Sequence, residues 1–262
     1  MAHNHRYESV VNILAQRVFT GKLAPGEKLP TERSLALSME IDRTSLRLAL
    51  KQLESLGVLD IRPGDGIYVK DFLKEAGPEF LRLIFAQEED DQGRPFAVDP
   101  YTVDEIWEFW CGFFPMMLKS AIRKIAPRDV KKLLDLVDEE KGSIGDVARL
   151  VDLNMREEDL VAAATNNIVF MLLSNVTRTI RKKMLTLFFS GTTSEVLTRH
   201  VELKRVFLEE FLTSPEKMLP LAAFYEDVLL AHLSEMRKKR SAGNGAGTLA
   251  ERYGTSLMEK SR

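Results

Sequence analysis

The chain has 262 residues, of which 45% are hydrophobic, a formal net charge of −2 and a single cysteine, Cys111. No apolar run approaches the ~20 residues of a helical membrane span, so we expect no membrane partner, and one cysteine excludes an internal disulfide. The polar N-terminus shows no secretory signal; together these features predict a cytoplasmic protein of about two domains.

The N-terminal region predicts two helices before residue 40. The first spans residues 7–20, and its apolar residues are Val10, Val11, Ile13, Leu14 and Val18. Pro30 and Thr31 open the second, a short helix in which Leu35 and Ala36 can pack on a neighbour. Arg33 points away from that apolar face, where it suits a phosphate contact.

The segment 42–56 predicts an amphipathic helix with separate apolar and basic stripes. Its apolar residues, spaced i, i+3, i+4 and i+7, are Leu46, Ala49, Leu50 and Leu53. Arg43, Arg47 and Lys51 follow at i, i+4 and i+8, and either Asp42 or Thr44 can cap the helix. An arginine near a helix start can bond two guanine atoms, while the hydroxyls of Thr44 and Ser45 suit phosphate.

A charged helical stripe is usually only a solvated face, so the flanking segments decide the interpretation. Residues 58–61 and 67–69 are two β-rich runs around the Gly-Pro turn of residues 62–66, a pattern typical of a hairpin. Two short helices followed by a hairpin predict a winged helix-turn-helix that binds double-stranded DNA.

The same residues resemble the entry signature of the GntR family of bacterial transcription regulators. The matching positions are Leu23, Pro25-Gly26, Lys28 to Arg33, Arg43-Thr44, Arg47, Ala49-Leu50, Leu53, Gly57-Val58-Leu59, Gly64, Gly66 and Val69. The resemblance implies DNA contacts by Arg33, Arg43, Thr44 and Arg47, with Gly64 at the tip of the wing. Two residues depart from it, because Asp42 and Asp65 place carboxylates where repulsion from DNA would lower affinity.

Beyond Lys70 the pattern becomes helical. Residues 71–86 predict a helix with a potential break at Gly77-Pro78, and an acidic, solvated loop follows at residues 88–95. From Val103 onward, apolar stripes at helical spacing predict an all-α bundle. These stripes are Val130-Leu133-Leu134-Val137, Ile168-Met171-Leu172-Val176-Ile180, Val196-His200-Leu203-Phe207-Phe211 and a fourth within residues 221–236.

The predicted fold class is therefore mainly α, with a winged helix-turn-helix followed by an all-α helical bundle. The predicted domains are residues 1–72 for DNA binding, 73–101 as a connecting helix and acidic linker, 102–240 for the bundle, and 241–262 as a flexible tail. This arrangement resembles the FadR branch of the GntR family. That resemblance implies a homodimer on a palindromic operator, with a small-molecule effector held in the bundle.

Many FadR-like relatives bind acids through a metal, but this chain lacks the ligand set. Asn154 and Glu158 stand where the resemblance implies aspartate and histidine, Lys204 lies near another ligand position, and His232 matches the last. One histidine beside a lysine does not hold a transition metal, so we predict neither a metal nor a cofactor.

The segment 103–124 predicts an effector of another chemistry. Trp107 stands where acid-binding relatives carry arginine, and Trp110 and Phe114 follow it, so these aromatics favour an apolar or acyl-like ligand. Glu158 and His232 complete the predicted effector site. The alternative interpretation is that the aromatic residues are simply core or dimer interface.

An enzyme is not predicted, because the chain carries no phosphate loop, zinc-protease motif or nucleophile elbow. The run Glu157-Glu158-Asp159 is interpreted as a solvated helix face rather than a catalytic pair. Two other functions stay open: an effector-independent architectural DNA-binding protein, and a winged-helix module that binds proteins.

Overall fold

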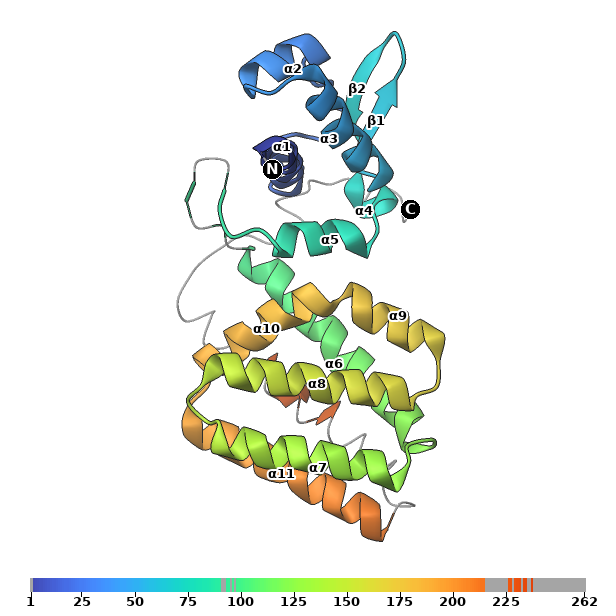
Figure 1. The fold of residues 1–262 in the computed structure, drawn as a ribbon, viewed down its shortest axis with the longest axis vertical. Helices are drawn as coiled ribbons and strands as arrows, with labels where there is room; N and C mark the ends of the chain where they lie inside the picture. The colour runs from blue at the N-terminus through green and yellow to red at the C-terminus, as the bar shows by residue number, and fades with distance from the viewer. Residues whose placement is uncertain are drawn as a thin grey trace, which may run out of the picture. The chain divides into compact units, whose positions relative to one another are not determined.

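A computed structural model describes residues 2–90, 93, 94, 96, 98–214, 226, 227, 229–231, 233, 234 and 237. The chain divides into two compact units between Val98 and Asp99 (Figure 1). The predicted tail, residues 241–262, lies outside the described residues. Among the helices within those ranges, none is long and apolar enough to cross a membrane.

The first unit is a winged helix-turn-helix extended by two further helices. Its elements in chain order are α1 (Ala2–Phe19), α2 (Glu32–Ser38), α3 (Arg43–Ser55), β1 (Leu59–Arg62), β2 (Gly66–Val69), α4 (Phe72–Glu75) and α5 (Pro78–Phe85). The two strands pair antiparallel, with Leu59 opposite Val69 and Arg62 opposite Gly66. The predicted helix-helix-hairpin order is thereby confirmed.

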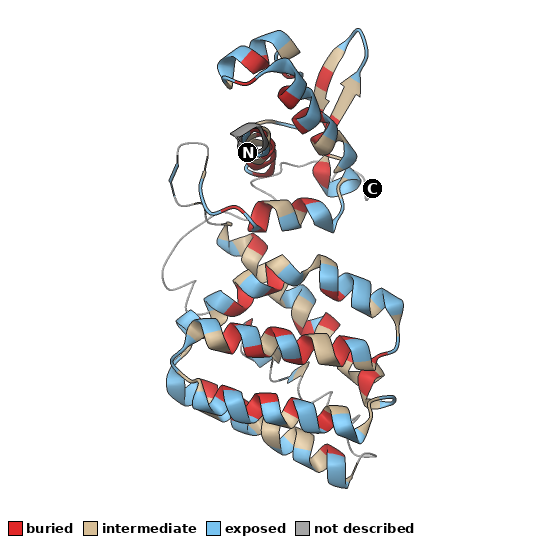
Figure 2. Cartoon of the chain, in the orientation of Figure 1, coloured by how far each residue is buried: buried red, intermediate tan, exposed pale blue. Residues whose placement is uncertain are grey.

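The core of the first unit forms around α3, whose predicted apolar stripe packs on α1 and β1. Its four stripe residues are buried (Figure 2): Leu46, Ala49, Leu50 and Leu53. Gly57 ends the segment with a φ of +73°, and a Cβ there would lie 2.2 Å from the carbonyl oxygen of Glu75. Only glycine therefore lets the chain turn from α3 into β1 at this point.

The predicted helix over residues 71–86 breaks at Gly77-Pro78, as the sequence suggested, giving α4 and α5. Phe80 of α5 packs against Phe72 of α4 and Phe19 of α1, with ring centroids 5.3 and 6.3 Å apart. These aromatic contacts anchor residues 72–85 in the core of the first unit.

The second unit is helical throughout its described residues. It contains α6 (Pro100–Ile122), α7 (Pro127–Gly142), α8 (Val147–Ala164), α9 (Ile168–Val176), α10 (Arg178–Gly191) and α11 (Ser194–Thr213). Helix α8 contacts α6, α7, α9 and α10, while α11 lies along α7 (Figure 1). This confirms the predicted all-α bundle and makes α8 its central helix.

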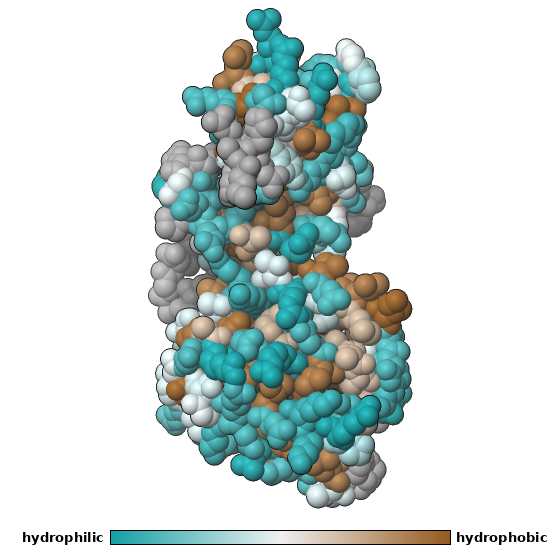
Figure 3. Space-filling model, in the orientation of Figure 1, coloured by the Kyte–Doolittle hydropathy of each residue, from teal (hydrophilic) through white to brown (hydrophobic). Residues whose placement is uncertain are grey.

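The predicted apolar stripe of residues 168–180 is mostly exposed rather than buried. The chain bends between α9 and α10, so Ile180 is buried whereas Ile168 is 70% exposed and Leu172 56% exposed. Figure 3 shows the resulting hydrophobic surface over α9. The prediction that this stripe faces the core was wrong, because one helical period was extended across two helices.

The stripe predicted on residues 196–211 faces the interior only in part. Phe211 is buried, whereas Val196 is 40% exposed and its neighbour Leu197 is buried instead. Lys204 has helical spacing from the buried residues Leu197 and Val201, so it also faces the interior of the bundle.

Candidate functional site

The start of α3 is held by a side-chain cap. Asp42 Oδ1 accepts hydrogen bonds from the backbone N–H groups of Thr44 and Ser45, at 3.0 and 2.9 Å. The Ser45 hydroxyl donates to Asp42 Oδ2 at 2.6 Å, and Ser45 is buried. Of the two predicted caps, Asp42 is the one used. The predicted DNA contact at Ser45 is therefore disfavoured, because its hydroxyl is already engaged in the cap.

The remaining predicted DNA contacts on the helices are exposed. Arg43 and Thr44 lie in the first turn of α3, and Arg33 lies on α2. Arg47 is 68% exposed and its Nε lies 2.8 Å from Glu32 Oε2, while Lys51 pairs with Glu54 at 2.6 Å. Such surface pairs contribute about 1 kcal/mol or less, so a phosphate or a base can replace them.

The wing turns at Gly64, whose φ is +77° and which follows Pro63. The Asp65 N–H donates to the Arg62 carbonyl at 3.0 Å, and proline followed by a positive-φ glycine fits a type II turn. The Tyr68 hydroxyl donates to Asp65 Oδ1 at 3.0 Å, and Lys28 Nζ lies 3.2 Å from the same atom. These two hydrogen bonds lower the pKa of Asp65, so it stays ionised and neutralises Lys28.

Sequence reasoning did not assign the two basic residues of the wing region. Lys28 and Arg62 both lie against the Tyr68 ring, their charged groups 5.3 and 4.4 Å from its centroid. Lys28 is one of the positions that match the GntR entry signature, but the sequence assigned it no function. An isolated β-bridge between Lys28 and Tyr68 brings Lys28 to the wing. No sequence pattern predicts this contact.

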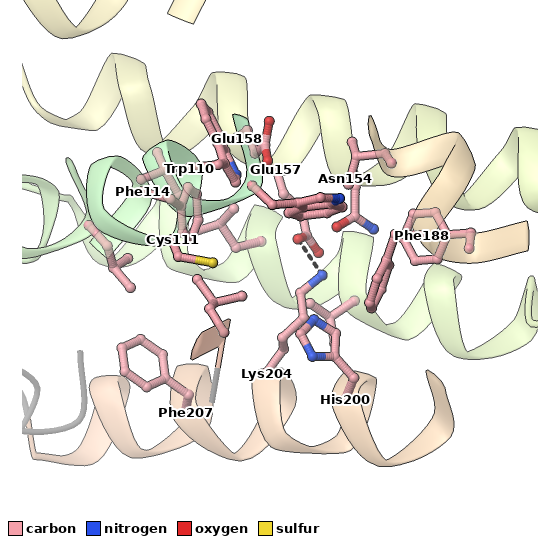
Figure 4. A pocket seen from close by; sticks show the side chains of 18 of the residues that line it. Trp110, Cys111, Phe114, Asn154, Glu157, Glu158, Phe188, His200, Lys204 and Phe207 are labelled. Atoms are coloured by element: carbon pink, nitrogen blue, oxygen red, sulfur yellow. Dashed lines mark ion pairs between the residues drawn. The ribbon is translucent and has the colours of Figure 1, made fainter. Parts of the chain in front are cut away.

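The second unit encloses a cavity of about 120 Å³ between its helices (Figure 4). This volume exceeds the ~15 Å³ that one water molecule requires, so the cavity has room for a small ligand. Four of the five predicted effector residues line it, namely Trp107, Trp110, Phe114 and Glu158. The fifth, His232, lies outside the described residues.

The apolar wall of the cavity comes from three helices. It includes Trp107 and Trp110 of α6, Phe188 of α10 and Phe207 of α11. The Trp107 and Phe188 rings are 5.8 Å apart in an edge-to-face arrangement. Cys111 also lines the cavity, and burial raises the pKa of its thiol to about 11, so this cysteine is not a thiolate nucleophile at neutral pH.

The polar wall includes Glu157 and Glu158 of α8 and Lys204 of α11, and Glu140 of α7 pairs with this lysine. Lys204 Nζ lies 2.7 Å from Glu140 Oε2 and 2.5 Å from Glu157 Oε2. Asn154 donates to the other oxygen of Glu140. Beside this cluster, Glu158 forms a buried ion pair with Arg181 of α10.

Burial is the largest influence on the pKa values of Glu157 and Glu158, which are adjacent on α8. It raises the pKa of Glu157 to about 8, an effect that Lys204 opposes and Glu140 reinforces. Burial also raises the pKa of Glu158, against the attraction of Arg181. The prediction that Glu157-Glu158-Asp159 forms a solvated face was therefore wrong for the first two residues, because α8 is surrounded by other helices.

Comparison with known proteins addresses the first unit most directly. The family described as "Bacterial regulatory proteins, gntR family" matches residues 6–69. The HTH-type transcriptional regulator Mce2R of Mycobacterium tuberculosis is 35% identical over 129 residues, which are 49% of this chain and 50% of that protein. The mannosyl-D-glycerate transport/metabolism system repressor MngR of Escherichia coli is 34% identical over 71 residues, 27% of this chain and 30% of that repressor.

Residues 6–69 form a GntR-family helix-turn-helix domain. The match spans α1 to β2, which are the elements that present Arg33, Arg43, Arg47 and Gly64. The chain spans about half the length of the Mce2R protein that it matches.

A solved structure of Lar from Listeria monocytogenes covers more of the chain. It aligns with 89% of this chain and 96% of its own, at a TM-score of 0.52 and 17% identity. This similarity supports the fold alone. The relatives named above are transcriptional regulators, not enzymes.

Proposed function

We propose that this protein is a sequence-specific transcription regulator of the FadR-like branch, binding a palindromic operator as a homodimer in the cytoplasm. The observation that carries the proposal is the GntR-family domain at residues 6–69. Its recognition helix α3 begins at a capped, exposed turn carrying Arg43 and Thr44. This geometry suits base readout in the major groove, because side chains at the start of a recognition helix reach base edges.

In the proposed mechanism, Arg43, Thr44 and Arg47 read the operator while Arg33 fixes the domain on the phosphate backbone. Binding frees Arg47 from Glu32 and Lys51 from Glu54, exchanging weak surface pairs for contacts with DNA. Lys28 and Arg62 add positive charge at the wing, which Asp65 partly cancels. We therefore expect α3 to contribute more affinity than the wing.

The effector site belongs to the same proposal and is the cavity of the second unit. Aromatic walls from α6, α10 and α11 favour an apolar or acyl-like ligand, and the charged residues of the wall fix its orientation. A ligand regulates DNA binding only if it favours one of two arrangements of the protein over the other. Ligand binding and DNA release must therefore be measured together.

The experiment is fluorescence anisotropy of the full chain on DNA from beside its own coding region and on a scrambled duplex, across a salt series near 0.15 M. We expect the native DNA to bind about a thousandfold more tightly than the scrambled one. Equal affinity for every duplex from that region would contradict operator recognition there and favour an architectural role. No binding at all would favour a protein-interaction module.

A further inference from the structure

Two carboxylates share one ammonium group beside the cavity. Lys204 Nζ contacts Glu157, as the dashed line in Figure 4 marks, and it also contacts Glu140. The three side chains are at most 11% exposed. If all three groups were ionised, they would together carry one excess negative charge in the interior, counted over the described residues alone. Such a buried charge is costly, and a proton on one of the carboxylates removes it.

The hydrogen bonds show which carboxylate holds the proton. Glu140 accepts from Asn154 on one oxygen and from Lys204 on the other, so its ionised form is fully satisfied. Glu157 accepts from Lys204 through Oε2 only, and its buried Oε1 has no hydrogen-bond partner among the described residues. The proton therefore belongs on Glu157 Oε1, in line with the pKa of about 8 for this group.

Several other ionisable groups lie near Glu157 in the described part of the bundle. Glu158 on the same helix is occupied by Arg181 of α10. Lys204 is shared between the two carboxylates described above. Among the described residues, the other ionisable side chains that line the cavity are His200 of α11 and the protonated thiol of Cys111 on α6.

Glu157 lines the cavity, and protonation of its carboxyl gives an O–H group without an acceptor among the described side chains. We propose that Glu157 is the hydrogen-bond donor to the cavity's ligand and selects a neutral carbonyl oxygen, as in an ester, thioester or amide attached to an apolar chain. A carboxylate head would add an unpaired charge to a cluster that is already neutral, and an alkylammonium head offers no acceptor. The inference rests on the effector role proposed for the cavity.

The chain supplies its own reporter for the test. Its two tryptophans, Trp107 and Trp110, both line the cavity, so intrinsic tryptophan fluorescence of the full-length protein responds to occupancy there. The probes are methyl octanoate, octanoate and octyltrimethylammonium, which share an apolar chain and differ in the head group. At pH 7 we expect methyl octanoate to bind at least about tenfold more tightly than either charged probe, because one lost hydrogen bond costs roughly that factor.

Two variants and a pH series isolate Glu157. Glu157→Gln keeps both a carbonyl for Lys204 and an N–H donor for the ligand, so its affinity for methyl octanoate should stay within about threefold of the wild type. Glu157→Leu removes the donor and should lose about tenfold or more. Between pH 7 and pH 9 the wild type should lose affinity as Glu157 deprotonates, whereas Glu157→Gln should not change.

The outcomes separate this inference from the proposed regulatory role. Binding of no probe, tighter binding of a charged probe, or parallel pH curves for the wild type and Glu157→Gln would overturn the role of Glu157. If Glu157→Leu fails to fold, which circular dichroism would show, the comparison of wild type with Glu157→Gln across the pH series still tests the role of Glu157. If methyl octanoate binds as expected but leaves operator affinity unchanged, the role of Glu157 stands and only the regulation of DNA binding fails.

Discussion

At the residue scale, Arg47 is one of the side chains that we propose read the operator. It is exposed, and its partner Glu32 lies at the surface of the same domain. Replacing Arg47 with alanine should cost about 1–3 kcal/mol on the operator, as expected for a lost bidentate base contact, and should reduce the preference over scrambled DNA. Anisotropy titrations on both duplexes measure this; an unchanged preference would show that Arg47 reads no base.

Arg33→Ala is the matched control for Arg47, because Arg33 lies on α2 and is proposed to contact phosphate. Loss of this side chain should weaken binding to the operator and to scrambled DNA to a similar extent. It should also lower by about one the slope of log affinity against log salt concentration. A selective loss on the operator alone would instead assign base recognition to Arg33.

A second residue-scale prediction concerns Glu157 and the pH dependence of stability. Its pKa of about 8 in the folded protein lies above the ordinary value of 4.5, so the folded state binds the proton more tightly than the unfolded state. The resulting stability is present in full below pH 4.5 and is lost as the pH rises through about 8. Thermal unfolding between pH 5 and pH 9 should therefore show a steeper decline for the wild type than for Glu157→Gln. Parallel declines would place the proton elsewhere in the cluster.

At the element scale, the N-terminus of α3 combines a structural and an electrostatic role in one residue. Asp42 caps the helix, yet its charge opposes an approaching phosphate. Asp42→Ala should destabilise the first turn by about 1 kcal/mol, visible as faster amide hydrogen exchange in residues 43–55. Asp42→Asn keeps the cap without the charge, so exchange should stay slow while DNA affinity rises. Equal exchange in both variants would mean that the cap does not stabilise α3.

At this scale, the sequence predicted the positions of the helices better than it predicted which of their faces are buried. The stripe of α3 was placed correctly because a short amphipathic helix has one neighbouring core to face. The stripe over residues 168–180 failed because periodicity cannot show that the chain turns between Val176 and Arg178. The prediction for α8 failed for another reason. Glu157 and Glu158 look like surface residues in the sequence, but α6, α7 and α10 pack against α8, and Lys204 of α11 pairs with Glu157.

At the scale of the whole molecule, the proposed homodimer constrains the DNA. Two copies related by a two-fold axis require two related half-sites, with centres about 10 bp or a multiple of that apart. Analytical ultracentrifugation should find two chains on a duplex carrying both half-sites, and deletion of one half-site should lower the affinity. One chain per duplex, bound equally well to a single half-site, would contradict the dimeric arrangement.

The sequence by itself determined the winged helix-turn-helix, its basic recognition helix and the helical character of the second unit. Those features depend on the local spacing of apolar, basic and turn residues, and this spacing does not depend on tertiary contacts. Only the tertiary structure decided that Asp42 caps α3, that Ser45 is engaged in that cap, and that Glu140, Glu157 and Lys204 meet at the cavity. The physical reason is that these charges lie on separate helices, so their pairing and their protonation arise from burial and proximity in the folded bundle.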